Sequence, residues 1–356
     1  MIRERKKRVV VAMSGGVDSS VAAALLVEQG FDVQGVSLRM WEENQGPRVC
    51  SDHRGAEEVA RLLGISHTLI DLRARFVERV VKPFARDYVC GRTPNPCVAC
   101  NRDFKLGTLL DWAKDQGADY IATGHYARIA VTHASRPYAL YRGADRGKDQ
   151  SYFLFALSQE QLAHTLFPLG EMHKSEVRKI ANRLGLAVAD RPESQDICFG
   201  NYRAVVESYA GEDEIRGGDI VDRSGKVLGR HGGIHSVTVG QRKGLKIAAA
   251  QPLYVVDIEQ ESKRVVVGNH AELHGQGLIA RNVSWIEPLE DRDFLAEVQI
   301  RSRSQAIPCA IQPAGERACT VRFKRSVPAV TAGQAAVFYR GDQVLGGGWI
   351  ERAIRA

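Results

Sequence analysis

No stretch of this sequence is apolar over the roughly 20 residues that a membrane-spanning helix needs. Residues 1–8 are rich in Lys and Arg and lead directly into a short strand-like run. A secretory signal peptide would need a longer apolar segment and a cleavage site made of small residues. We therefore expect a cytoplasmic protein that does not act at a membrane.

Cysteines are too few, and odd in number, for a framework of structural disulfides. The seven are Cys50, Cys90, Cys97, Cys100, Cys198, Cys309 and Cys319. In a reducing cytoplasm, such a set favours redox, metal-binding or nucleophilic roles for some of its members. Cys309 and Cys319 stand in strand-like runs. We expect these two, like Cys50, to be small buried hydrophobes.

The chain has no basic tail, although Lys and Arg exceed Asp and Glu by 49 − 42 = 7. The excess is spread along the sequence. It is densest at residues 301–325, which hold six Lys or Arg and one acidic residue. A basic surface of this kind permits a polyanionic partner such as nucleic acid, without proving one.

No internal repeat or low-complexity stretch interrupts the chain, and its 356 residues suggest two to three domains. Residues 8–130 alternate between strand-like and helix-like segments, which predicts an α/β domain with a doubly wound parallel sheet. Residues 151–200 are predicted to be mostly helical. Small β units follow, and the last part is predicted to be an antiparallel β-barrel. We expect domains at 1–205, 206–274 and 275–356.

Individual elements follow from apolar runs, helical spacing and glycine stops. In the first domain we expect strands at 8–13, 31–38, 67–70 and 120–123, and helices at 18–29, 55–63 and 104–113. Small β units are expected at 218–228 and 254–267. The barrel is expected to contain strands at 294–300, 309–311, 319–323, 335–339 and 344–348.

A glycine-rich loop joins the first predicted strand to the first predicted helix. It reads Ser14-Gly15-Gly16-Val17-Asp18-Ser19, and we call it the phosphate loop. Its glycines let the backbone approach an anion closely, and the helix that follows presents N–H groups to that anion. It matches neither the Walker A motif nor the dinucleotide fingerprint. It resembles the S-G-G-x-D-S PP-loop of the ATP pyrophosphatases; a Ser/Gly turn that only caps a helix is the simpler alternative.

Further motifs follow in a fixed order along the chain. They are Asn95-Pro96-x-x-x-Cys100-Asn101, Gly124-His125-Tyr126, Lys148-Asp149-Gln150-Ser151-Tyr152, Ser194-Gln195-Asp196-Ile197-Cys198-Phe199, Gly233-Ile234-His235, Gly240-Gln241-Arg242-Lys243-Gly244-Leu245 and Gly333-Gln334-Ala335-Ala336-Val337-Phe338-Tyr339. Together with the phosphate loop, they resemble the bacterial tRNA-specific 2-thiouridylases over nearly the whole chain. Pro94 and Pro96 are expected to exclude helix until after Cys100.

The resemblance implies an enzyme that replaces the 2-oxygen of the wobble uridine of tRNA by sulfur. ATP would adenylate that oxygen, with Mg²⁺ assisting and Asp18 helping to hold the ion. AMP then becomes the leaving group, and pyrophosphate is released. Cys198 matches the position that carries a persulfide, and Cys100 matches the nucleophile that closes a transient disulfide with it. The sulfur would come from a cysteine desulfurase or a persulfide relay protein.

The resemblance also implies binding positions for both substrates. The ATP-contacting positions are Ala12, Met13, Ser14, Gly15, Gly16, Val17, Asp18, Ser19, Leu38 and Gly124. The tRNA-contacting positions are Asn95, Pro96, Cys97, His125, Lys148, Asp149, Gln150, Arg301, Ser302 and Gln334. Simpler alternatives are a solvated turn at 148–150, a barrel-surface charge at Arg301 and an ordinary packed histidine at His125.

Cys97 departs from a common form of the family, which has Asp at this position. It is either a spectator thiol or, with Cys100 and Cys198, a ligand of an iron–sulfur cluster or of a zinc site. Two other functions stay open at this point. One is a PP-loop ligase or amidotransferase that acts on a small molecule and does not need Cys100 and Cys198. The other is a non-catalytic RNA-binding protein, which the intact phosphate loop and the two placed cysteines disfavour.

Overall fold

The first domain is built on a five-stranded parallel sheet. The computed structural model describes residues 5–41, 52–132, 136–186, 188–189, 197–287 and 292–355. The strand order is β3-β2-β1-β4-β7. The strands are β1 (Arg8–Ala12), β2 (Asp32–Arg39), β3 (Ser66–Asp71), β4 (Tyr120–Ala122) and β7 (Thr165–Leu166). Because β1 pairs in parallel with both β2 and β4, the carboxyl ends of these three strands meet at one edge.

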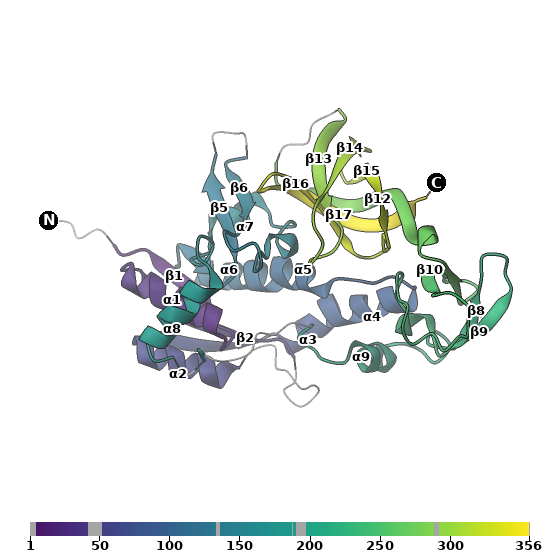
Figure 1. The fold of residues 1–356 in the computed structure, drawn as a ribbon. Coiled ribbons are helices and arrows are strands. Elements are labelled where there is room, and N and C mark those ends of the chain that lie inside the picture. The colour runs from purple at the N-terminus through teal and green to yellow at the C-terminus, as the bar shows by residue number, and fades with distance from the viewer. Residues whose placement is uncertain are drawn as a thin grey trace.

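The central strand β1 is buried on both faces, which is typical of a parallel sheet covered by helices on both sides. Val9 and Val11 pack into a core with α1 (Val17–Glu28), α2 (His53–Leu63) and α8 (Lys174–Arg183). Val10, which points the other way, packs into a second core with the helices of residues 73–115. Helices thus lie on both faces of the sheet (Figure 1), and the predicted doubly wound fold is confirmed.

The second helical layer contains several helices that the sequence patterns do not predict. Its elements are α3 (Arg73–Phe76), the π-helix η2 (Val77–Val81), α4 (Lys82–Val89), α5 (Pro96–Cys100), the π-helix η3 (Asn101–Thr108) and α6 (Leu109–Asp115). The helix predicted at 104–113 is present, but its first part is π-helical. No helix in the described part of the chain is long and apolar enough to span a membrane.

Helix α5 contradicts the expectation that two prolines exclude helix until after Cys100. Asn95 is the N-cap of α5, and its Oδ1 accepts a hydrogen bond from the Cys97 N–H at 3.2 Å. Pro96 occupies the first helical position, where its missing N–H would have no partner and its fixed φ already suits a helix. Cys97 and Cys100 are therefore one helical turn apart on the same side of α5.

The prediction of a mostly helical segment at 151–200 is only partly right. The described residues of this segment hold η4 (Ser151–Phe153), α7 (Gln159–Ala163) and α8, separated by non-helical backbone and by strand β7. Leu154, Leu157 and Leu162 are all buried in the core. The spacing of these leucines therefore shows that they are buried. It does not require a helix, because Leu154 and Leu157 lie outside the helices of this segment.

A small central domain and a closed barrel follow. The central sheet has the order β10-β11-β8-β9 and consists of β8 (Gly218–Val221), β9 (Val227–His231), β10 (Tyr254–Glu259) and β11 (Arg264–Gly268). The short helices α9 (Tyr202–Tyr209) and η6 (Ala271–Leu273) precede and follow these strands in sequence, and η5 (Ile234–Ser236) lies between β9 and β10. The β units predicted from the sequence are confirmed.

Six antiparallel strands form the barrel (Figure 1). They are β12 (His274–Trp285), β13 (Phe294–Gln299), β14 (Ile307–Pro313), β15 (Ala318–Pro328), β16 (Ala335–Arg340) and β17 (Gln343–Ile354). Pairing of β12 with β17 closes the sheet on itself. The predicted barrel is confirmed, and β12 is a strand that the sequence patterns do not predict.

A hairpin of the first domain extends the barrel sheet. It consists of β5 (Ala127–Val131) and β6 (Tyr138–Arg142). In its pairing with β17, Leu140 lies opposite Val344 and Tyr141 opposite Gln343. The hairpin and the six barrel strands thus form one continuous sheet, which is separate from the parallel sheet of the α/β domain.

Candidate active site

The phosphate loop turns tightly between β1 and α1. Gly15 has a φ of +74°, and a Cβ at this position would lie 2.2 Å from the carbonyl oxygen of Asp52. The Asp52 N–H donates to the carbonyl of Ser14 at 2.8 Å. Only glycine combines this backbone conformation with so close an approach. The loop is therefore held against the residue that caps α2.

Serine hydroxyls brace the loop from inside. The Ser14 N–H donates to Ser19 Oγ at 3.1 Å. The hydroxyls of Ser19 and Ser20 donate to the carbonyl of Gly16 at 3.1 and 2.9 Å. Gly16 is the N-cap of α1 and has no side chain that could occupy the first N–H groups of this 12-residue helix. A helix N-terminus in this state is suited to bind a phosphate.

Two other predicted ATP positions lie near the loop because of the strand order. Leu38 is buried near the carboxyl end of β2, and Gly124 follows β4. A Cβ at Gly124 would lie 2.7 Å from the backbone carbonyl carbon of Asp18 and from the backbone nitrogen of Ser19. The predicted ATP positions thus gather at the carboxyl edge of the sheet, where open α/β sheets bind ligands.

Asp18 is already engaged by two side chains. The Lys174 Nζ lies 2.7 and 2.8 Å from the two carboxylate oxygens, and the Tyr126 hydroxyl donates to Oδ1 at 2.8 Å. The Lys174 side chain is only 10% exposed. No sequence motif pointed to Lys174, because it stands 156 residues from its partner. These contacts take up part of the acceptor capacity of the Asp18 carboxylate, and its expected role as a magnesium ligand stays a prediction.

Cys97, Cys100 and Cys198 form a cluster that we call the thiol cluster. Burial, with a smaller contribution from the nearby Cys198, raises the pKa of Cys100 to about 12 and the pKa of Cys97 to about 11. The Cys100 Sγ lies 3.7 Å from the Sδ of Met40, just beyond the end of β2. All three are reduced thiols in the structure. The two cysteines predicted to react are therefore brought together, with Cys97 beside them.

Aromatic packing holds the Cys198 segment near α5. The neighbouring Phe199 is 1% exposed, and its ring centroid lies 5.0 Å from that of Phe84 and 5.9 Å from that of Trp41. Such tilted and edge-on ring contacts stabilise the packing beyond the area they bury. Phe199 thus anchors the second cysteine to the helical layer that carries the first. Residues 194–196 of the same motif lie outside the described residues.

Lys105 acts electrostatically on two thiols of the cluster and on His125. Lys105, on η3, favours the ionised forms of Cys97 and Cys100, which lowers their pKa values against the effect of burial. Burial, together with the charge of Lys105, lowers the pKa of His125 to about 3. His125 Nδ1 lies 2.7 Å from Thr123 Oγ1. His125 is therefore neutral near pH 7, and Lys105 is a cation that no sequence motif revealed.

All three domains meet at Thr93, two residues before the N-cap of α5. Its N–H donates to the carbonyl of Ala332, and its own carbonyl accepts from Gln334 Nε2 at 2.8 Å. Its hydroxyl donates to Thr238 Oγ1 in the central domain at 3.4 Å. Gln334, a predicted tRNA position, thus supports the backbone that leads to Cys97.

The predicted tRNA positions at 148–150 form a braced turn. The Asp149 carboxylate accepts from Arg142 Nη1 at 3.0 Å and from Ser151 Oγ at 2.9 Å, and its side chain is 8% exposed. The Gln150 Oε1 accepts from the Tyr126 N–H at 3.0 Å. These two side chains are held by hydrogen bonds within the protein, and Lys148 beside them is half-buried.

Arg301 and Ser302 lie at an exposed end of the barrel. The Arg301 guanidinium donates to the carbonyl of Ala329 at 2.9 Å and to Thr331 Oγ1 at 3.2 Å. The basic residues of the 301–325 segment are all exposed; they are Arg301, Arg303, Arg317, Arg322, Lys324 and Arg325. This segment therefore presents a positively charged surface.

The thiol cluster does not fit a metal site as it lies here. In the part of the chain that the structure describes, no group of three or more His, Cys, Asp or Glu side chains is arranged to hold a metal ion. Cys309 and Cys319 are buried in the barrel core, as expected for small hydrophobes. Cys50 lies outside the described residues.

The chain matches family models and curated relatives over nearly its whole length. Models described as the tRNA methyl transferase HUP domain, the tRNA methyl transferase PRC-barrel domain and the aminomethyltransferase beta-barrel domain match residues 7–201, 203–269 and 275–350. The tRNA-specific 2-thiouridylase MnmA of Geotalea uraniireducens is 48% identical, over 98% of this chain and 96% of that protein. The protein of the same name from Syntrophotalea carbinolica is 50% identical, over 98% of this chain and 100% of that protein. The chain belongs to the family of the tRNA-specific 2-thiouridylases.

Proposed function

We propose that the protein is an ATP-dependent sulfurtransferase that converts the wobble uridine of tRNA to 2-thiouridine. One observation carries this: the phosphate loop and the thiol cluster belong to one edge of one sheet. Cys100 contacts Met40, two residues beyond Leu38, and His125 directly follows Gly124, which packs on the loop. Adenylation and sulfur transfer need this proximity, because the activated carbonyl must meet the sulfur before water does.

The first half of the reaction uses the phosphate loop. The loop and the α1 N-terminus bind the phosphates of ATP, and the uridine O2 attacks the α-phosphorus. Pyrophosphate leaves, and O2 becomes part of a good leaving group, AMP. We propose that Mg²⁺ arrives with the ATP phosphates, because Asp18 is held by Lys174 and Tyr126. A cationic Lys174 next to the loop would further stabilise phosphate charge.

The second half uses two cysteines. The terminal sulfur of a Cys198 persulfide attacks C2, AMP leaves, and the base is then joined to Cys198 through a disulfide. The Cys100 thiolate attacks Cys198 Sγ, and the sulfur leaves with the bonding electrons as 2-thiouridine. The remaining Cys100–Cys198 disulfide is reopened by an external thiol reductant. Cys97 takes no part in this sequence and is a spectator thiol.

We propose the remaining assignments on the same basis. The ATP positions are those at the sheet edge, and the tRNA positions are those of α5, the 148–150 turn and the barrel surface. Residues 1–205, 206–274 and 275–356 form the catalytic domain, the central domain and the tRNA-contacting barrel. The persulfide is loaded by a cysteine desulfurase or a persulfide relay protein. The enzyme acts in the cytoplasm.

Mass analysis of tRNA nucleosides tests this function. Unmodified tRNA is incubated with the protein, ATP, Mg²⁺, cysteine, a cysteine desulfurase as the persulfide donor and a thiol reductant, and pyrophosphate release is measured in parallel. We expect 2-thiouridine that depends on ATP. A parallel reaction replaces ATP and the persulfide donor with S-adenosylmethionine, because two of the matching family models carry a methyltransferase description. Methylated tRNA, or pyrophosphate release without thiolation by the wild-type protein, would contradict the proposal.

A further inference from the structure

Lys105 stands on a π-helical turn that begins directly after Cys100. The helix η3 ends with a hydrogen bond from the Leu109 N–H to the carbonyl of Phe104, five residues earlier. In an α-helix, residues three and four apart share a face, so a residue five positions on is turned away. In a π-helix the bonds join residues five apart, which brings such residues nearly one above the other. The π-turn thus turns Lys105 toward the side of Cys100.

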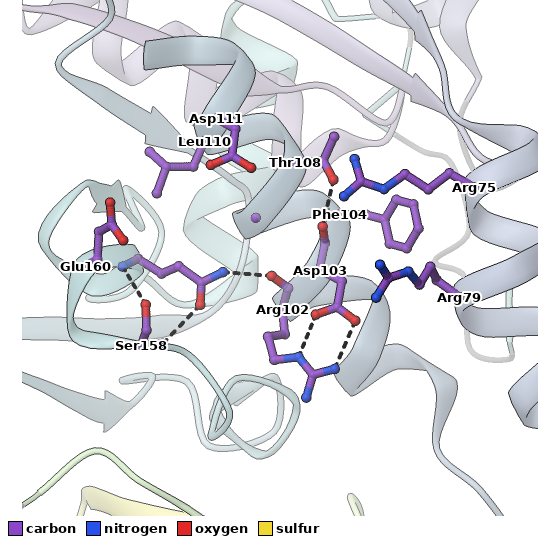
Figure 2. Close-up of a pocket in the computed structure, with 12 residues that line it drawn as sticks. Arg75, Arg79, Arg102, Asp103, Phe104, Thr108, Leu110, Asp111, Ser158 and Glu160 are labelled. Carbon is purple, nitrogen blue, oxygen red and sulfur yellow. Dashed lines mark hydrogen bonds and ion pairs between the residues drawn. The ribbon is translucent and has the colours of Figure 1, made fainter. Parts of the chain in front are cut away.

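Side chains from outside the helix maintain this wide turn. Gln161 Nε2, from α7, donates to the carbonyls of Arg102 and Leu106 at 2.7 and 2.9 Å. Within the turn, Thr108 Oγ1 donates to the carbonyl of Asp103 at 2.8 Å (Figure 2). A Cβ at Gly107 would lie 2.6 Å from the carbonyl oxygen of Arg102, so this position needs glycine. These contacts satisfy carbonyls that a π-turn opens outward.

The other side of η3 faces a separate pocket of about 370 Å³. Arg102, Asp103 and Thr108 line it, together with Arg75 from α3 (Figure 2). Arg102 and Asp103 form a bidentate pair at 2.6 and 2.9 Å. Lys105 does not line this pocket, so η3 presents a neutralised ion pair on one side and an ammonium group on the side of the thiols.

The thiol of Cys100 needs such a cation. Burial, Cys198, Cys97 and Asp103 all raise its pKa, whereas Lys105 lowers it. The nearby His125 is neutral and supplies no charge. A thiol attacks a disulfide only as the thiolate. Without Lys105, every remaining group that affects the pKa of Cys100 would disfavour the thiolate, which is the form that attacks.

We propose that Lys105 stabilises the Cys100 thiolate for its attack on Cys198, and that the π-turn held by Gln161 serves to place this charge. The inference rests on the proposed function. In the step concerned, the electron pair of the Cys100 thiolate forms the new bond to Cys198 Sγ. The bond from Cys198 to the transferred sulfur breaks, and that sulfur takes the electron pair away as a thiolate. The step needs no further oxidant.

Alkylation kinetics on the full-length reduced protein test the charge effect without tRNA or ATP. The rate at Cys100 is followed by peptide mass analysis with iodoacetamide at several pH values between 7 and 9. Loss of one nearby opposite charge should raise the pKa of Cys100 by about one unit. Since a more basic thiolate is also more nucleophilic, Lys105→Gln should slow alkylation about three- to fourfold overall. Lys105→Arg should restore the rate.

Matched controls separate charge from access and from folding. Lys114→Gln removes an exposed lysine of α6 and should leave the alkylation rate of Cys100 unchanged. The thiol of Cys90, which lies outside the cluster, should be alkylated at the wild-type rate in Lys105→Gln. The smaller reagent methyl methanethiosulfonate should show a similar slowing if charge is the cause. Gln161→Ala keeps Lys105 but loosens the turn, and should also slow alkylation of Cys100. The inference would be overturned if folded Lys105→Gln alkylates Cys100 at the wild-type rate, or if Lys105→Arg slows alkylation as much as Lys105→Gln does. If these rate effects are present but the protein does not thiolate tRNA, only the proposed function is overturned.

Discussion

Lys174 clamps Asp18 through both carboxylate oxygens, at 2.7 and 2.8 Å, at the mouth of the phosphate loop. The pair joins the first turn of α1 to the first turn of α8, which lie 156 residues apart in sequence. The conformation of the phosphate loop therefore depends on how α1 and α8 pack against each other on one face of the sheet.

Asp18→Ala should abolish ATP-dependent adenylation, because it removes the carboxylate that holds the Lys174 ammonium beside the phosphate loop, while tRNA affinity stays close to that of the wild type. The change leaves the largely buried ammonium of Lys174 without its carboxylate, which we expect to cost about 2–3 kcal/mol of stability. Pyrophosphate release, filter binding of tRNA and urea unfolding measure the three properties. The double variant Asp18→Asn/Lys174→Met should regain much of the stability but no adenylation. Equal loss of tRNA binding and of adenylation would contradict the assignment.

Cys198→Ser should retain ATP binding and pyrophosphate release but form no 2-thiouridine, because a hydroxyl cannot carry a persulfide. Cys100→Ser should also fail to release product, since it lacks the thiolate that frees the sulfur. The two variants differ in what accumulates. tRNA should remain covalently bound in Cys100→Ser and be released by an added thiol. Full thiolation by Cys198→Ser would overturn the mechanism.

The same mechanism predicts a Cys100–Cys198 disulfide in wild-type protein after one turnover without reductant. Peptide mass mapping detects it, and Cys90 serves as the internal control that should stay reduced. A disulfide needs Cα atoms within about 7 Å, so any longer resting separation must shorten during the reaction.

Cys97→Ala should keep most of the activity, because neither transfer step uses this thiol. Its pKa of about 11 leaves it almost entirely protonated at pH 7. Thiolation assays and an absorbance spectrum of anaerobically purified protein check this. Loss of a visible chromophore together with activity would instead favour a cluster held by Cys97, Cys100 and Cys198.

The buried His125 should make stability fall on acidification. Its pKa of about 3 lies below the unfolded value of 6.5, so the folded state holds fewer protons between these two values. The free energy of unfolding is then full above pH 6.5 and decreases as the pH falls toward 3, by at most about 1.4 kcal/mol per pH unit. Urea unfolding of the wild type and of His125→Asn between pH 4 and 7 measures this. The variant should show a flatter dependence; an equally steep profile would contradict the role of His125.

Binding of tRNA should weaken with salt and depend on the exposed basic residues of 301–325. Each phosphate contact contributes about 0.7–0.9 to the slope of log affinity against log salt. Replacing Arg303, Arg322 and Lys324 by Ala should reduce both the slope and the affinity. A matched variant that loses Arg230, Lys243 and Lys246 of the central domain should change binding less. An affinity that does not respond to salt would remove the electrostatic basis for this surface.

Local patterns were enough to predict the phosphate loop, most strands of the first sheet and the barrel. Their signals lie within short segments: glycines at a turn, alternating apolar residues in strands. Lys174 and Lys105 could not be predicted in the same way. Lys174 acquires its role from a partner on a distant helix, and Lys105 from a π-turn that depends on Gln161 in α7. Ordinary helical spacing would have turned Lys105 away from Cys100.

For Cys100 and Cys198, too, local motifs predict one part of the site and distant packing determines the other. The motifs predict which two cysteines react, and the packing of Phe199 against Phe84 and Trp41 places the second predicted cysteine in the helical layer that carries the first. The prediction that helix begins only after Cys100 is wrong because Pro96 is the first residue of α5, a position that favours proline.

The shared sheet between β6 and β17 has a consequence for biosynthesis. β6 leaves the ribosome about two hundred residues before the strand that covers its edge, since Tyr141 pairs with Gln343. Until then the growing chain carries an open strand edge beside Leu140, which is fully buried in the finished protein. Such edges invite pairing with other chains and aggregation. Synthesis of this protein should therefore place a heavier demand on chaperones than its α/β domain and its barrel would if each closed its own sheet.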